Sequence, residues 1–165
     1  MRAAPRDPPA TTAKARCPAA GPAGLAAPSD DAVLDSALCT SRGFMGVLSA
    51  CHGSGGLQCA DALAARLEQT YRGDLISLAR LIAIGDVLAF DWNRSWWTPM
   101  FQFHPTNLSI KPGAQAVQAA LGPQFRGWPG ASWWARRNPW LGCARPLDRL
   151  DGGLAEVLHA ARQAR

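Results

Sequence analysis

The sequence of 165 residues predicts a mainly α-helical, compact domain with an inserted β-hairpin, preceded by a disordered arm. Three observations support this fold class. Residues 1–28 include 18 Ala, Pro and Gly residues, so this segment has almost nothing apolar to bury. From residue 29 onward, apolar residues recur repeatedly at helical spacing. In contrast, residues 87–103 alternate with a period of two, which is typical of strands.

Order is expected to begin near residues 29–31, Ser-Asp-Asp, because such side chains cap helix N-termini. Apolar residues then follow the helical period as far as Cys51, with an interruption at Gly43. This pattern indicates one bent helix or two short ones. Residues 53–56, Gly-Ser-Gly-Gly, are predicted to form a loop.

Two further helices are expected between residues 57 and 84. The first begins at Leu57 and ends at 71–73, and the second has Asp74 as its N-cap and Gly85 just after its end. A short turn containing glycine joins them, which is the outline of a helix-turn-helix. Residues 29–110 are therefore assigned to an N-terminal helical part that contains this pair and the hairpin.

The hairpin is predicted from a strand over 87–92, a turn over 93–95 and a returning strand over 96–103. Pro99 indicates an edge strand or a bulge, since proline lacks a backbone donor. Residues 111–165 are assigned to a C-terminal helical part. Its helices are expected after Pro112, over 128–137, from Pro146 and over the last apolar stripe, 154–161.

Charge and cysteine content exclude several classes of protein. The net charge is +5, but the arm holds +3 of it, so the remaining chain is nearly neutral and is no polybasic nucleic-acid coat. No apolar run approaches about 18 residues, so no membrane span is expected. Five cysteines, an odd number without a CxxC pair, argue against a disulfide framework and favour a reducing, cytoplasmic location.

Tryptophan is the most unusual feature of the composition. Because neighbouring residues on a strand face opposite ways, one of Trp96 and Trp97 is expected to point away from the core. Exposed Trp together with Arg is typical of protein-binding hot spots, while burial in the core is the alternative for each ring. All seven tryptophans lie within 49 residues: Trp92, Trp96, Trp97, Trp128, Trp133, Trp134 and Trp140.

Catalytic and metal-binding constellations are sparse, so no catalytic residue, metal or cofactor is assigned and no enzyme activity is expected. Cys51 and His52 are only sequence neighbours, which does not place sulfur against imidazole. A zinc site that adds Cys59 and His104 lacks the usual close pairs of ligands. The 53–56 loop is not followed by Lys-Ser or Lys-Thr, so it is a weak phosphate loop.

DNA binding is the alternative function that the helix pair over 57–84 leaves open. Its second helix offers only Ser77 and Arg80 as contacts to bases or phosphates, whereas recognition helices normally present several such side chains. The basic arm adds weak, salt-sensitive phosphate contacts. Operator DNA is therefore retained as a second possible partner.

The C-terminal stretch carries the most specific pattern, N-P-x-L-G-x-x-x-P-x-D-x-L over residues 138–150. Asn138 is expected to bond free backbone groups after a helix, and Gly142 permits a positive φ. Upstream, Pro99–Phe103 reads P-x-F-Q-F and follows a Phe-x-Trp strand over 90–92. Over roughly 54–165, this order of motifs resembles the toxin-binding domain of the Xre/MbcA/ParS-like antitoxins.

The resemblance implies a type II antitoxin whose partner is a RES-domain toxin that consumes NAD⁺ or transfers ADP-ribose. It further implies that the protein binds the toxin, covers its active site and assembles as a homodimer or a larger complex with toxin. From the composition of the loop, we expect the contact surface to comprise 138–149 and the last helix, with Trp140 as anchor and arginines that complement an anionic cleft. The predicted contact residues are Asn138, Pro139, Trp140, Leu141, Gly142, Arg145, Pro146, Arg149, Arg162 and Arg165.

Overall fold

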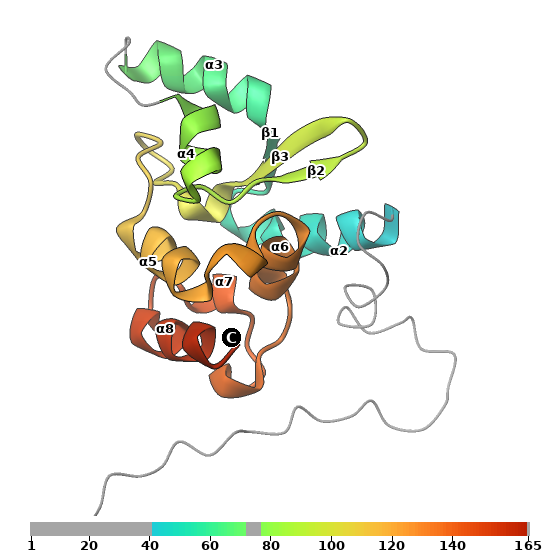
Figure 1. The fold of residues 1–165 in the computed structure, drawn as a ribbon, viewed down its shortest axis with the longest axis vertical. Coiled ribbons are helices and arrows are strands. Elements are labelled where there is room, and N and C mark those ends of the chain that lie inside the picture. Colours follow the sequence, from blue (N-terminus) through green and yellow to red (C-terminus); the bar gives the residue numbers. More distant parts are fainter. Residues whose placement is uncertain (1–40, 72–76, 165) are drawn as a thin grey trace, which may run out of the picture.

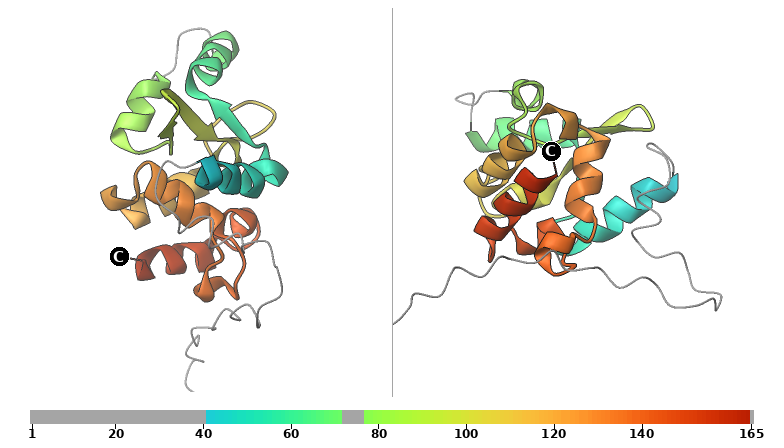
Figure 2. Two further views of the ribbon diagram at one scale, coloured as in Figure 1. Left: turned by 90° about the vertical axis from the view of Figure 1, so that its right-hand side faces the viewer. Right: turned by 60° about the horizontal axis from the view of Figure 1, so that its bottom comes forward.

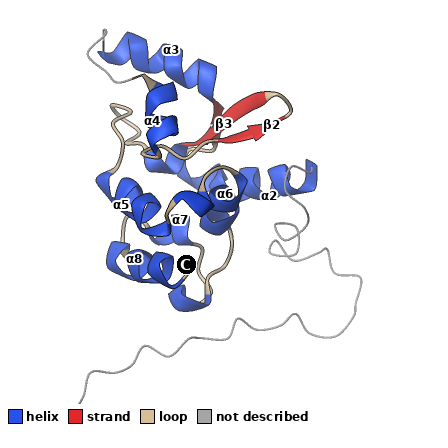
Figure 3. Ribbon diagram, in the orientation of Figure 1, coloured by secondary structure: helices blue, strands red, loops and turns tan. Residues whose placement is uncertain are grey.

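A computed structural model describes residues 41–71 and 77–164, which form a mainly helical domain with a small antiparallel sheet, as predicted (Figures 1 and 3). The predicted arm and the predicted helix start at 29–31 lie outside the described residues. Among those residues, no helix has the length and apolar character needed to cross a bilayer. The α-helices are α2 (Ser41–Cys51), α3 (Ala60–Tyr71), α4 (Leu78–Ile84), α5 (Pro112–Leu121), α6 (Trp128–Ala135), α7 (Pro146–Arg149) and α8 (Leu154–Gln163).

The predicted hairpin is confirmed, but its strands have other bounds: β2 (Phe90–Trp92) begins at residue 90 instead of 87, and β3 (Ser95–Pro99) begins at Ser95, which was assigned to the turn. Strand β3 is the central strand of the sheet, so Pro99 does not mark an edge strand. The two turn residues of the hairpin, Asn93 and Arg94, have φ values of 51° and 60°. Such left-handed pairs match the twist of a hairpin. The returning strand ends at Pro99 instead of residue 103, because Met100–Gln102 turn into a 3-10 helix, η2.

A third strand, β1 (Leu57–Cys59), pairs antiparallel with the other edge of β3, where the sequence predicted the start of a helix. Gly55 and Gly56, with φ of 98° and 74°, turn the chain so that it runs along β3. The N–H of Met100 donates to the carbonyl of Gly56 at 2.9 Å and extends the pairing. Helix α3 therefore begins only at Ala60.

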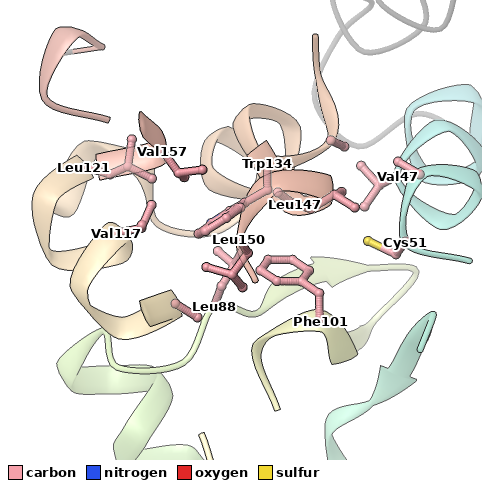
Figure 4. Close-up of a cluster of buried hydrophobic side chains, with 14 of the residues drawn as sticks. Val47, Cys51, Leu88, Phe101, Val117, Leu121, Trp134, Leu147, Leu150 and Val157 are labelled. Carbon is pink, nitrogen blue, oxygen red and sulfur yellow. The ribbon is translucent and has the colours of Figure 1, made fainter. Parts of the chain in front are cut away.

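Two hydrophobic clusters stabilise the domain. The larger cluster joins α2, the sheet and α5 to α8 around Trp134, which is 1% exposed (Figure 4). The indole N–H of Trp134 donates to Gln118 at 3.3 Å, and its ring lies 4.7 Å from that of Phe101. The smaller cluster joins α3, α4 and the segment that contains Phe103 and Leu108. Figure 1 and the left view of Figure 2 place α3 and α4 at one end of the molecule and α8 at the other.

Gln102 fastens the two ends of the hairpin to each other. Its side chain is buried, accepts from the N–H of Leu88 and donates to the carbonyls of Leu88 and Pro99, each at 2.9 Å. The three bonds join the segment that enters β2 to the residue that ends β3. The glutamine of the P-x-F-Q-F segment thus has a structural role inside the protein.

The tryptophans divide between core and surface. Trp128 and Trp134 are buried, and four others are half-buried, namely Trp92, Trp97, Trp133 and Trp140. Trp96 is 52% exposed, which confirms that one of the adjacent pair on β3 points away from the core. Trp97 shares the opposite face with Phe90, its cross-strand partner, and packs edge-on against Phe44 of α2.

The second helix of the predicted helix-turn-helix, α4, starts later than expected. Its N-cap is Ser77, whose hydroxyl oxygen accepts from the N–H of Arg80 at 3.4 Å; Asp74 was the wrong choice and lies outside the described residues. Gly85 follows the helix with φ 91°, as predicted. The guanidinium of Arg126 donates to the carbonyls of the last two helical residues, so α4 is capped at both ends.

Candidate protein-interaction surface

The predicted contact loop lies between α6 and α7, and Asn138 closes it. The side-chain oxygen of Asn138 accepts from the N–H of Trp140 at 2.9 Å and caps the short 3-10 helix η4 (Pro139–Leu141). Its backbone N–H donates to the carbonyl of Ala144 at 2.9 Å, and its carbonyl accepts from the N–H of Cys143 at 3.0 Å. One residue therefore holds both ends of the loop together, which confirms its expected role at the helix break.

The reversal of the loop needs two consecutive left-handed residues, Gly142 with φ 61° and Cys143 with φ 64°. The first was expected, because glycine adopts this conformation at little cost. Cys143 is disulfide-bonded, which the argument against a disulfide framework did not predict, whereas Cys51 and Cys59 are free. The guanidinium of Arg137 donates to the carbonyl of Cys143 at 3.4 Å and braces the same turn.

Trp140 joins the loop to the last helix. Its ring contacts His159 of α8 edge to face, with the ring centroids 5.5 Å apart and the planes at 78°. The indole is half-buried and His159 is exposed, so part of this pair is open to solvent. Helix α8 buries Val157, Ala160 and Ala161. Its packing against η4 makes the loop and the outer face of α8 one continuous surface.

The predicted contact residues do not all reach that surface. Leu141 and Pro146 are buried, so they shape the loop from the core and are not available to a partner, which corrects their assignment. Arg165 lies outside the described residues. Gly142, Arg149 and Arg162 are exposed, and the half-buried members of the set are Asn138, Pro139, Trp140 and Arg145.

The charge of this surface is mainly basic. Residues 136–162 contain five arginines and three carboxylates. One of these carboxylates, Asp151, is paired with Lys111, whose ammonium lies 2.7 Å from it. Arg149 and Arg162 extend from α7 and α8 into solvent. An anionic or hydrogen-bond-accepting partner would meet complementary charge here.

No match was found for the chain among family models, curated proteins or solved structures. Its function therefore has to be argued from the motif, the geometry of this surface and the remaining candidate sites.

The Cys51–His52 pair does not form a nucleophilic site. Cys51 is buried in the larger cluster, while His52 is exposed at the start of the 3-10 helix η1 (His52–Ser54). Burial raises the pKa of the Cys51 thiol to about 12; the charges of Arg145 and Asp148 have smaller, opposing effects. The thiol is therefore protonated at neutral pH, and a thiol is a poor nucleophile compared with a thiolate.

The residues of the candidate zinc site and of the candidate phosphate loop do not form such sites either. Within residues 41–71 and 77–164, no group of three or more His, Cys, Asp or Glu side chains could hold a metal ion. The zinc set suggested by Cys59 and His104 is thus not assembled. In the 53–56 loop, the hydroxyl of Ser54 donates to the carbonyl of Cys51 at 3.1 Å, which makes it part of a turn.

The candidate DNA-contacting residues lie on α4, a helix of seven residues. Ser77 is used as its N-cap, and Arg80 is exposed. The other exposed residues of α4 are Ala79, Ala83 and Ile84. An outward face with one cation among three apolar residues is unlike the polar face of a recognition helix.

Sequence reasoning missed two residues that organise these surfaces. His159 supports Trp140 from a helix 19 positions away in sequence, and no local pattern marks it. Arg126 caps α4 from 42 positions beyond the last residue of the helix, again without a local signal.

Proposed function

We propose that the protein is a type II antitoxin that binds a RES-type toxin, NAD-consuming or ADP-ribosylating, and covers its active site. The assignment to this class of antitoxin is based on the motif over residues 138–150. The observation that carries the proposal is that this motif builds a closed, backbone-bonded loop with Trp140 half-exposed at its centre. Arg149 on α7 and Arg162 on α8, the elements that follow the loop, are exposed.

The loop suits docking because its shape is fixed before binding. The hydrogen bonds of Asn138 and the contact of Trp140 with His159 already restrict the conformation of the loop. Binding of a partner therefore costs less conformational entropy. Half-exposed tryptophan combined with arginine is typical of interface hot spots. In the proposed complex, Arg149 and Arg162 face the nucleotide-binding cleft of the toxin. The antitoxin inhibits the toxin by blocking this cleft.

Co-expression with the product of the neighbouring open reading frame tests the proposal. We expect a stable complex and rescue of growth when that product is toxic. Trp140→Ala and Arg149→Glu should each weaken the complex by ~2 kcal/mol, or about 30-fold in Kd. Arg94→Glu, which makes the same charge change in the exposed hairpin turn, is the matched control and should leave Kd unchanged. The absence of a complex and of rescue would refute the proposal.

A DNA-binding regulator that acts through residues 57–84 on its own operon is the rival proposal. It has less support, because this segment holds three arginines and three acids and because α4 presents mostly apolar residues. A mobility shift on the promoter of its own operon at two salt concentrations separates the two ideas. Sequence-specific, salt-sensitive binding lost in Arg80→Ala would favour the regulator.

A further inference from the structure

A cleft of about 800 Å³ opens along the seam between the two hydrophobic clusters. Its apolar floor draws on both of them. The larger cluster contributes Phe101, Leu147 and Leu150 (Figure 4), and the smaller contributes Met100, Phe103 and Leu108. Concave sites of roughly 300–1,000 Å³ with a mainly apolar lining and a few polar groups are typical of small-ligand binding.

The formal charges around this cleft cancel. Its lining includes two basic side chains, Arg66 and Lys111, and two acidic ones, Asp148 and Asp151, with His104 counted as neutral. Lys111 and Asp151 are paired with each other, since the ammonium lies 2.7 Å from the carboxylate. Within the part of the chain that the structure describes, neither Arg66 nor Asp148 takes part in a salt bridge, and both are exposed. The cleft therefore offers a ligand one cation and one anion.

The cation and the anion come from different sides of the seam. Arg66 is on α3, which packs in the smaller cluster, and Asp148 is on α7, which packs in the larger one (Figure 1). The guanidinium of Arg66 donates to the side-chain oxygen of Gln58 at 2.8 Å, and Gln58 also lines the cleft. This bond holds the guanidinium at the cleft and leaves most of its five N–H donors for a ligand.

This distribution of charge favours a zwitterion over an anion. A nucleotide would bring at least two negative charges close to the carboxylates of Asp148 and Asp151, and like charges in contact oppose binding. A molecule with one ammonium and one carboxylate meets an opposite charge at each end. The volume of the cleft matches a ligand larger than a single amino acid, and its floor matches apolar side chains.

We infer that the cleft binds a short apolar peptide with free ends. The terminal carboxylate of the peptide accepts from the guanidinium of Arg66, and its terminal ammonium donates to the carboxylate of Asp148. The apolar side chains of the peptide lie on the floor formed by the two clusters. The inference does not rest on the proposed function, since none of the predicted toxin-contact residues lines the cleft.

Equilibrium dialysis of the full chain against trileucine tests the site, with the peptide quantified by mass spectrometry. We expect a Kd below ~1 mM for trileucine. Trileucine amide and acetyl-trileucine should each bind at least about tenfold more weakly, because each lacks one charged end. Adenosine monophosphate should bind more weakly than trileucine. A Kd above ~1 mM for trileucine, equal binding of the capped peptides, or tighter binding of the nucleotide would overturn the inference.

Two surface variants assign the ends of the peptide. Arg66→Gln should abolish the preference for the free carboxylate over the amide and keep the preference for the free amine; Asp148→Asn should do the reverse. Arg94→Gln, which removes an exposed arginine from the hairpin turn, is the control and should keep both preferences. Circular dichroism verifies the fold of each variant. Variants that keep both preferences, or that weaken all three peptides equally, would contradict the assignment.

The peptide assay contains no toxin, so its outcome is separate from that of the co-expression test. Arg66→Gln should still form the complex with the toxin, because Arg66 is not a predicted contact residue. A chain that binds the toxin but not trileucine would overturn this inference alone. A chain that binds trileucine but not the product of the neighbouring reading frame would overturn the proposed function alone.

Discussion

Replacement of Gln102 by leucine is the sharpest test of how the hairpin is held. The side chain is 3% exposed and makes three bonds of 2.9 Å, all to backbone groups of Leu88 and Pro99. Leucine has a similar volume but can neither donate nor accept. Gln102→Leu therefore leaves one N–H and two carbonyl bonds unmade in a site that water does not reach.

The expected loss in the free energy of unfolding follows from the three backbone groups that lose their hydrogen-bond partner. A buried backbone group left without its partner costs about 1–3 kcal/mol. Three such groups give roughly 3–9 kcal/mol, and the burial of leucine in place of an amide offsets about 2 kcal/mol of this. The difference is roughly 1–7 kcal/mol. We therefore expect the free energy of unfolding to fall by about 4 kcal/mol, the middle of this range and a large part of the stability of a domain of this size.

Urea unfolding followed by tryptophan fluorescence measures this loss. With a typical dependence of about 1–3 kcal/mol per molar urea, the midpoint should fall by at least ~1 M. Gln69→Leu, on the exposed face of α3, is the matched control and should shift the midpoint by less than ~0.3 M. A Gln102→Leu variant as stable as this control would show that the three bonds do not hold the hairpin.

Three further predictions concern single buried positions. Gly130→Ala should destabilise the fold by ~3 kcal/mol or more, because its Cβ would lie 2.0 Å from the carbonyl oxygen of Phe125; Gly53→Ala, with open space around it, should change the urea midpoint little. Thr98→Val should be neutral or stabilise by up to ~1 kcal/mol in the same assay, since the buried Thr98 hydroxyl has no hydrogen-bond partner. Cys51 should resist iodoacetamide at pH 8 in the native protein and react in urea, as read by mass spectrometry. Because folding raises the pKa of this thiol from 9.0 to about 12, its contribution to stability is present below pH 9 and is lost as the pH rises toward 12.

Local rules predicted the parts of the fold in which a residue type has one strong conformational preference. The hairpin follows from alternation of apolar residues on either side of the turn predicted over 93–95, and the exposure of Trp96 follows from the pleat of the strand. The loop after α6 follows from Asn138, which caps, and Gly142, which permits a positive φ. In each case the deciding interaction lies within a few residues of the one that predicts it.

The predictions of secondary structure and burial were wrong where contacts with distant segments determine the conformation of a residue. Leu57 fits the apolar stripe of α3, but pairing with Pro99 holds it in a strand. Asp74 and Ser77 are both good caps, and sequence alone does not choose between them. Leu141 lies in the middle of a loop that was predicted to face a partner, yet it is 5% exposed because the loop folds back onto the core. Burial depends on tertiary packing, so local composition could not identify it.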